Sequence, residues 1–351
     1  MQSTRTDLVV LGPSSHMVWL SGLSPHGDER PVMLFVTQDF AALLMPALNA
    51  DSSRAVTGLP FYTWTDAEGP AAALAGLLDD ADAHRKGLNI GLDETMRADF
   101  ALLVLDALPN VARREFTDPT IGALRALKDD GEYRALKENA LIDDIAMQAG
   151  FAACRPGVTE LEVVDIINKS FEAQGAQPGF TLVCFGENGA FPHHHSGRRA
   201  LKPDDTILLD IGGRKDGYPS DMTRVGVIGR VDPEFDKVWG IVDAAVKAAV
   251  AAARPGVPAS AVDRAARDVI TAAGYGEYFL HRTGHGLGID VHEPPYITAT
   301  SERILEEGNV FSIEPGVYLQ GRFGIRLEEI VILRRDHAEI LSGLPRDAVR
   351  R

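Results

Sequence analysis

Four carboxylates in the second half of the chain interrupt runs of apolar residues. Asp210 ends the run TILLD, Asp221 follows in GYPSDMTR, Glu314 ends VFSIE, and Glu328 lies within FGIRLEEIVIL. Each aspartate alone could cap a turn, and each glutamate alone could be a charge on an edge strand. All four in apolar contexts point instead to a shared site, because burying a carboxylate is costly unless a counter-charge neutralises it.

Three histidines occur in the segment FLHRTGHGLGIDVHEPP, namely His281, His285 and His292. The glycines between them argue against a helix and for backbone that approaches another group closely. A single histidine would more often be a satisfied core residue, but three so close together indicate a site. If His285 joins the four carboxylates, two divalent cations would balance the charge. Oxygen-rich ligation with one imidazole suits Mn²⁺, Co²⁺, Fe²⁺ or Zn²⁺.

The elements that must position these residues are mostly strands. The sequence GYPS between Asp210 and Asp221 predicts a hairpin turn, which would place the two aspartates side by side on antiparallel strands. A single strand over FGIRLEEIVIL would present Arg326 and Glu328 on one face and Glu329 on the other.

The first part of the chain alternates short apolar runs with helical patterns, which predicts a small α/β domain. We expect strands at 7–11, 31–37 and 89–92, and helices at 40–50, 71–84 and 100–108. A polar segment ending in Asp118-Pro119 precedes a strongly helical stretch, so we place the domain boundary near residue 117. The predicted domains are therefore residues 1–117 and 118–351.

The second domain contains a weak internal repeat. The tetrapeptide RPGV begins at Arg155 and again at Arg254, in each case between two predicted helices. Two unrelated helical segments would explain this as well. If the repeat is real, its halves pack about a pseudo-two-fold axis, and a site between them takes ligands from both.

Composition excludes several classes of function. The 351 residues carry a net charge of −15, which disfavours binding to nucleic acid or anionic lipid. Two cysteines exclude a disulfide framework and suit a reducing cytosol. The N-terminus lacks the pattern of a signal peptide, and no apolar run approaches the length of about 18 residues that spans a membrane. We therefore expect a cytoplasmic protein.

The motifs DIGG, GYPSDMTR, TGHGLGIDVHE, SIEPG and GIRLEEIVIL, in this order, resemble the pita-bread metallopeptidases, which include methionine aminopeptidase, aminopeptidase P and Xaa-Pro dipeptidase (prolidase). The resemblance covers roughly residues 118–345. It implies an α+β catalytic domain with a pseudo-two-fold repeat, after a small N-terminal α/β domain typical of the proline-directed members. It also implies a homodimer and two bound divalent ions, of which we favour Mn²⁺ over Co²⁺, Zn²⁺ or Fe²⁺.

The resemblance also implies roles for individual residues. The metal ligands would be Asp210, Asp221, His285, Glu314 and Glu328. Glu314 would in addition carry the proton to the leaving nitrogen, and His292 would stabilise the tetrahedral intermediate. Substrate contacts and charge steering would come from His193, His281, His292, Tyr296 and Arg326. His194 and His195 would be solvated loop residues.

One position departs from the family pattern. Many prolidases carry an arginine that can bind the free carboxylate of the dipeptide where this chain has Tyr296, and the nearest later arginine is Arg303.

The predicted function is a metal-dependent Xaa-Pro dipeptidase acting on small proline-containing peptides. An aminopeptidase P is the alternative, because Tyr296 would leave room for further residues. A lyase or a binding module on the same fold remains a further alternative. Absence of stoichiometric metal after reconstitution would favour the binding module.

Overall fold

The computed structural model describes residues 1–230 and 232–351 and divides the chain into two compact units, Met1–Arg125 and Ala126–Arg351. The division falls later than residue 117 because the segment after it belongs to the first unit. A π-helical turn at Asp118–Gly122 buries Ile121 in the core of that unit. The guanidinium of Arg125 then donates to Nδ1 of His16 at 3.1 Å.

The first unit is a small α/β domain built on a six-stranded mixed sheet with the strand order β4-β3-β2-β1-β5-β6. Its strands are β1 (Leu8–Leu11), β2 (Met33–Val36), β3 (Ala41–Pro46), β4 (Phe61–Trp64), β5 (Leu88–Leu92) and β6 (Val111–Phe116). Its helices are α1 (Ser15–Ser21), α2 (Ala47–Arg54), α3 (Ala71–Asp80), α4 (Ala98–Ala107) and α5 (Ala123–Arg125).

The helix predicted over residues 40–50 is wrong in its first half. Residues Ala41–Pro46 form β3, which pairs with β2 on one side and β4 on the other, and helix α2 begins only at Ala47. A short continuous apolar run fits a buried strand as well as a buried helix. Burial of Leu43 and Leu44 within the sheet decides for the strand.

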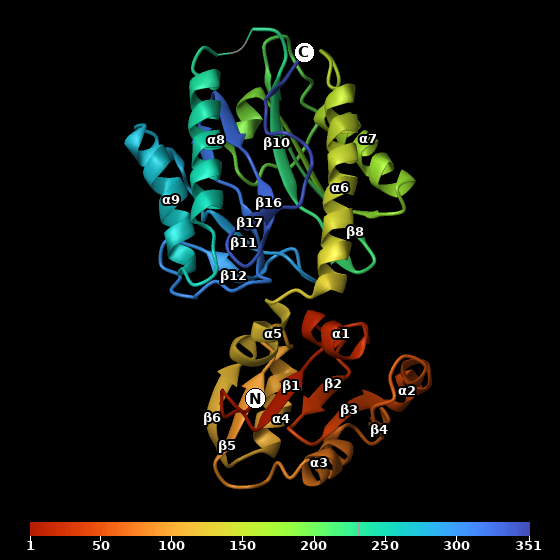
Figure 1. The fold of residues 1–351 in the computed structure, drawn as a ribbon. Coiled ribbons are helices and arrows are strands. Elements are labelled where there is room, and N and C mark those ends of the chain that lie inside the picture. Colours follow the sequence, from red (N-terminus) through yellow and green to blue (C-terminus); the bar gives the residue numbers. More distant parts are fainter. Residues whose placement is uncertain (231) are drawn as a thin grey trace. The chain divides into compact units, whose positions relative to one another are not determined.

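The second unit has curved sheets flanked by two helix pairs, and their strands pair antiparallel except for β10 and β18, which are parallel (Figure 1). One sheet has the order β18-β10-β8-β7, with β9 beside β8; another has the order β12-β11-β13-β16-β17, and β14 pairs with β15. The helices are α6 (Asp130–Ala153), α7 (Glu160–Ala173), α8 (Phe235–Ala252) and α9 (Ala259–Ala272). The strands are β7 (Gln177–Phe185), β8 (Thr206–Lys215), β9 (Tyr218–Pro219), β10 (Met222–Val227), β11 (Gly284–Gly286), β12 (Glu293–Ile297), β13 (Val310–Ile313), β14 (Gly316–Leu319), β15 (Phe323–Arg326), β16 (Glu329–Leu333), β17 (Ala338–Ile340) and β18 (Val349–Arg350).

The RPGV repeat corresponds to a structural repeat. Each copy joins two packed helices, α6 to α7 and α8 to α9. Its glycine has a positive φ in both copies, 92° at Gly157 and 89° at Gly256, which favours glycine at this position. The amide of each glycine donates over 2.8 Å to a leucine carbonyl, that of Leu201 in the first copy and of Leu305 in the second.

Candidate dinuclear metal site

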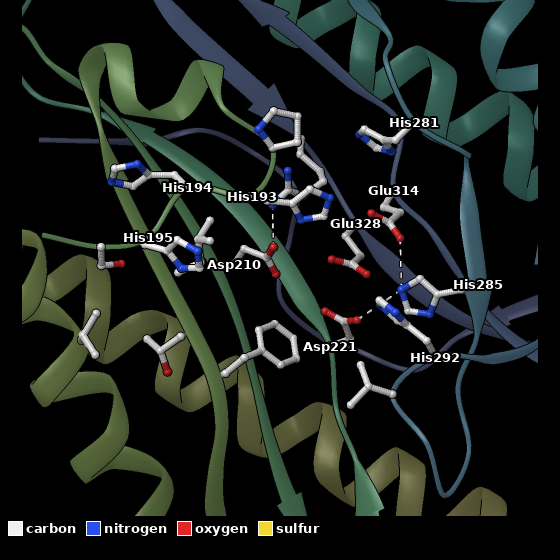
Figure 2. A pocket seen from close by; sticks show the side chains of 18 of the residues that line it. His193, His194, His195, Asp210, Asp221, His281, His285, His292, Glu314 and Glu328 are labelled. Atoms are coloured by element: carbon white, nitrogen blue, oxygen red, sulfur yellow. Dashed lines mark hydrogen bonds and ion pairs between the residues drawn. The ribbon is translucent and has the colours of Figure 1, made fainter. Parts of the chain in front are cut away.

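A pocket of about 1000 Å³ in the second unit gathers the predicted site residues (Figure 2). They reach it from strands β8, β11 and β15, which belong to three different sheets, and from loops. The predicted residues that line it are His193, Asp210, Asp221, His281, His285, His292, Glu314, Arg326 and Glu328. Tyr296 is the one predicted site residue that is not part of its lining.

The two aspartates lie where β8 and β10 run antiparallel, but the turn predicted over GYPS is misplaced: the chain turns at Asp216–Gly217, and Tyr218–Pro219 form β9, which pairs with β8. Asp210 is within β8 and pairs in register with Thr223 of β10, while Asp221 immediately precedes β10. Asp221 is buried, and Asp210 is mostly buried. Oδ2 of Asp210 accepts a hydrogen bond from Nη2 of Arg326 at 2.5 Å.

His285 lies at the centre of β11, between two carboxylates. Its Nε2 is 3.2 Å from Oε1 of Glu314 and 3.6 Å from Oδ2 of Asp221 (Figure 2). The neighbouring Gly284 allows this position, because a Cβ there would collide with the carbonyl oxygen of Ser312. The close approach predicted from the glycines is therefore real, and at Gly284 the group approached is backbone of the adjacent chain segment.

Arg326, Glu328 and Glu329 do not lie on one strand, contrary to the sequence prediction. Arg326 ends β15, Glu329 begins β16, and these strands belong to different sheets. Arg326 and Glu328 still face the pocket, whereas Glu329 points to a separate polar network. The turn between β15 and β16, and not alternation along one strand, therefore directs Glu328 and Glu329 to different sides.

These residues fit divalent cations. Three groups of ligand atoms each lie within 4.8 Å of one another: Asp221, His285 and His292; His285, Glu314 and Glu328; and Asp210, Asp221 and Glu328. Oδ1 of Asp210 and Oε1 of Glu328 are buried with no hydrogen-bond partner among the described residues. Such orphaned acceptors are costly, and cations would satisfy them.

The electrostatics of the carboxylates point the same way. Burial raises the pKa of Asp221 well above its usual value, and the charges of Glu328, Asp210 and Glu314 raise it further. Burial and the neighbouring Glu314 and Asp210 likewise raise the pKa of Glu328. For Glu314, burial acts to raise the pKa, but the hydrogen bond and charge of His285 outweigh it and lower the pKa to about 2. Asp221 and Glu328 therefore resist ionisation unless a bound cation compensates their negative charge.

The remaining pocket histidines have different surroundings. The ring of His292 lies 3.9 Å from that of His285, and Nε2 of His281 is 2.7 Å from the hydroxyl of Tyr318. His193 is exposed on the pocket wall. His194, expected to be merely solvated, is anchored instead, because its Nε2 is 3.2 Å from a carboxylate oxygen of Glu160.

Sequence reasoning missed Thr223, Tyr318 and Glu160, which hold the site residues in place. Arg326 donates to the hydroxyls of Tyr318 at 2.7 Å and Thr223 at 3.1 Å, and Thr223 donates to Glu328 at 2.8 Å. The fully buried Glu160 also accepts from the amide of Gly197 at 2.8 Å, and so closes the loop that carries the histidines. Threonine and tyrosine are ordinary residues in strands, and glutamate is ordinary in the first turn of a helix. The sequence therefore gave no sign that these three residues belong to the site.

Tyr296, the remaining residue predicted to bind substrate, is not among the residues that line the pocket. The side chain is 39% exposed on β12, and its ring packs against the guanidinium of Arg282 at 4.8 Å. Arg282 does line the pocket. Sequence reasoning missed it, although it lies between two of the predicted site histidines.

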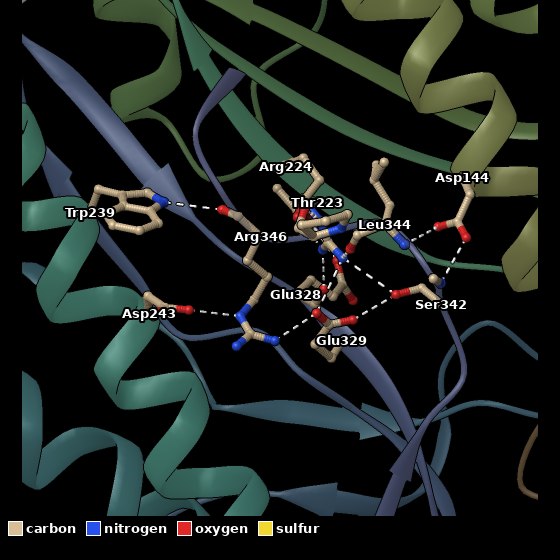
Figure 3. Close-up of polar contacts among 12 residues, drawn as sticks. Asp144, Thr223, Arg224, Trp239, Asp243, Glu328, Glu329, Ser342, Leu344 and Arg346 are labelled. Carbon is tan, nitrogen blue, oxygen red and sulfur yellow. Dashed lines mark hydrogen bonds and ion pairs between the residues drawn. The ribbon is translucent and has the colours of Figure 1, made fainter. Parts of the chain in front are cut away.

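A polar network supports the backbone of the site from behind (Figure 3). Arg224, which is 1% exposed, donates to the carbonyl oxygens of Glu328 at 2.5 Å and Leu344 at 2.7 Å. Glu329 pairs with Arg224 at 3.2 Å and with Arg346 at 2.8 Å. The network therefore fixes the turn that presents Glu328 to the pocket.

Replacing Arg224 by methionine is expected to lower the free energy of unfolding by about 3–5 kcal/mol, because it leaves Glu329 short of a partner in a buried site. Urea denaturation measures the change. R335M, at an exposed arginine, is the control and should stay within about 0.5 kcal/mol of wild type. A loss below about 1 kcal/mol for R224M would show that the network contributes little.

Comparisons with known proteins agree with this geometry. The sequence profile of metallopeptidase family M24 matches residues 134–335. The dipeptidase PepE from Mycobacterium ulcerans has a TM-score of 0.93 at 33% identity, over 99% of this chain and 94% of its own. A prolidase from Thermococcus sibiricus has a TM-score of 0.90 at 34% identity, over 99% and 95%. An Xaa-Pro dipeptidase from Lactobacillus delbrueckii subsp. lactis is 32% identical, over 96% of this chain and 92% of its own.

The fold and the ligand set define a metal-dependent hydrolase with a pita-bread catalytic domain. The chain belongs to metallopeptidase family M24. The resemblance stated from the sequence motifs is thereby confirmed, together with the fold class and the metallopeptidase activity. Among the described residues, no helix is long and apolar enough to cross a membrane.

Proposed function

We propose that this protein is an Xaa-Pro dipeptidase that binds two divalent cations, Mn²⁺ by preference. The observation that carries the proposal is the pocket in which four carboxylates and His285 converge with two orphaned oxygens, in a chain of family M24. The printed names of its relatives, dipeptidase, prolidase and Xaa-Pro dipeptidase, favour dipeptides. Four oxygen donors with one imidazole suit Mn²⁺.

The residues divide the chemistry between them. When bound, the cations would polarise the scissile carbonyl and make water a better nucleophile. Glu314 is positioned beside His285 to take a proton from the attacking water and pass it to the proline nitrogen as the C–N bond breaks. His292 would donate a hydrogen bond to the developing oxyanion. Arg326 holds Asp210 and leaves its other oxygen free for a cation.

The test compares Ala-Pro with Ala-Pro-Ala, using protein reconstituted with Mn²⁺. Preferential cleavage of the dipeptide is expected. Faster cleavage of the tripeptide would make the protein an aminopeptidase P. If neither is cleaved while metal binds in stoichiometric amount, a non-peptidase such as a lyase becomes the better reading; no bound metal would favour a binding module.

Replacing His292 by alanine is expected to lower kcat for Ala-Pro by about 10²-fold, the effect of losing one oxyanion donor. Burial, and then the positive charges of His285 and Arg282, lower the pKa of His292 to about 4. The imidazole is therefore neutral at pH 7 and would donate as a neutral N–H group, so the activity profile should show no step near pH 6.5 from this residue. Rates from pH 4 to 8 measure this. H337A, at an exposed histidine, is the control, and equal rates for H292A and H337A would contradict the role.

The proposal includes a cytoplasmic homodimer. Both cysteines are free and buried, which suits a reducing compartment. The dimer rests on analogy with the family. Light scattering on the purified protein tests it against the 37.9 kDa of one chain.

A further inference from the structure

Arg282 is a cation at the pocket wall that has no ion-pair partner among the described residues. Its side chain is half-buried, lines the pocket, and contributes positive charge at His292. Among residues 1–230 and 232–351, no hydrogen bond or ion pair engages its guanidinium. Its Cζ lies 4.8 Å from the centroid of the Tyr296 ring, and this stacking restrains the side chain without using its donors.

The other arginine that lines the pocket is already committed. Arg326 donates to Asp210, Tyr318 and Thr223 and is buried. The lining contains no lysine. Within the described part of the chain, Arg282 is thus the one arginine or lysine of the pocket whose donors are available to a ligand.

The chemistry of the proposed substrate calls for such a group. An Xaa-Pro dipeptide carries a carboxylate one residue beyond the scissile bond, and the pocket that must accept it already holds four carboxylates. The proposed cations would balance those four carboxylates, so the carboxylate of the substrate still needs a partner of its own. A guanidinium binds a carboxylate through two parallel hydrogen bonds. Arg282 also directly follows His281 and lies near His292, so it is beside the residues expected to contact the substrate.

We propose that Arg282 binds the C-terminal carboxylate of the dipeptide and thereby selects dipeptides over longer peptides. Tyr296 supports this arginine from behind and does not itself contact the substrate. The inference rests on the proposed dipeptidase function and assigns the carboxylate subsite of the same pocket.

The experiment compares Ala-Pro with Ala-Pro-amide, which lacks the carboxylate, in Mn²⁺-reconstituted wild type, R282Q and R282K. The ratio of KM for Ala-Pro to KM for the amide should rise about 10-fold to 100-fold in R282Q, the range for loss of a charge-assisted hydrogen bond. R282K keeps the charge without the fork of donors and should lie between R282Q and wild type. Y296A should raise the ratio by a smaller factor, because the arginine loses its support.

R335Q, at an exposed arginine, is the matched control and should leave the ratio at the wild-type value. Thermal melting checks that each variant is folded. An unchanged ratio in R282Q, with wild type still cleaving Ala-Pro, would overturn the role of Arg282 and leave the dipeptidase function intact. If wild type cleaves neither substrate, the proposed function itself fails and this inference fails with it.

Discussion

Asp221→Asn is expected to lower kcat/KM for Ala-Pro by about 10⁴-fold, the largest effect we foresee for a single substitution. Asp221 contributes to two of the three ligand groups, so the neutral amide weakens both cation positions. Bound cations supply several kcal/mol of transition-state stabilisation, and each 1.36 kcal/mol is about tenfold in rate. Activity assays combined with metal analysis by mass spectrometry check the result, and the metal content should fall below two ions per chain.

The same substitution also changes how the stability of the metal-free protein depends on pH. The pKa of Asp221 is raised by burial and by its carboxylate neighbours, so the folded state holds this proton to a higher pH than the unfolded state does. Metal-free wild type should therefore lose stability as pH rises above about 4, the usual pKa of an aspartate, towards the higher pKa of the folded state, and D221N should lose less. Thermal melting in the presence of a chelator measures both. Full metal content in D221N, or equal pH dependence of the two proteins, would contradict the assignment.

Glu314→Gln is expected to lower kcat by about 10³-fold to 10⁴-fold, the upper end of the range for general acid–base catalysis. The hydrogen bond and charge of His285 lower the pKa of Glu314 to about 2 against the effect of burial, so the carboxylate is ionised at pH 7 and can accept a proton. Glutamine keeps the shape and accepts no proton. Steady-state kinetics with Ala-Pro, at saturating Mn²⁺, measures the loss.

E307Q, at an exposed glutamate, is the control for the charge change and should match wild type. The acid limb of the wild-type profile should not come from Glu314, since its carboxylate stays ionised down to about pH 2. A loss of less than about tenfold in E314Q would show that another group carries the proton.

Membership of the candidate site could be predicted for its carboxylates, because each is a charged residue within an otherwise apolar stretch. Asp210, Asp221, Glu314 and Glu328 are charges within apolar runs, and burial of such groups demands an explanation wherever the strands end up in space. The antiparallel placement of β8 and β10 followed from the turn residues between the aspartates. These inferences needed only local sequence and the cost of burying charge.

Other features depended on partners far away in the chain. Thr223 and Tyr318 are unremarkable residues of strands until Arg326 is seen to bridge them. Residues 41–46 became a strand because β2 and β4 were available on either side. Local pattern could not distinguish these outcomes, since pairing and packing against distant segments decide them.

The sequence by itself determined the family through the resemblance of its motifs. It also indicated the class of chemistry and the ligand types, because burial of four carboxylates with a histidine is costly without cations. Only the tertiary structure decided which arginine of the pocket keeps its hydrogen-bond donors available for the substrate. Tyr296 and Arg282 are 14 residues apart, and the pairing of β11 with β12 stacks one on the other and leaves the arginine at the pocket. Which donors stay unpaired after such packing is a property of the folded chain, and no local pattern carries it.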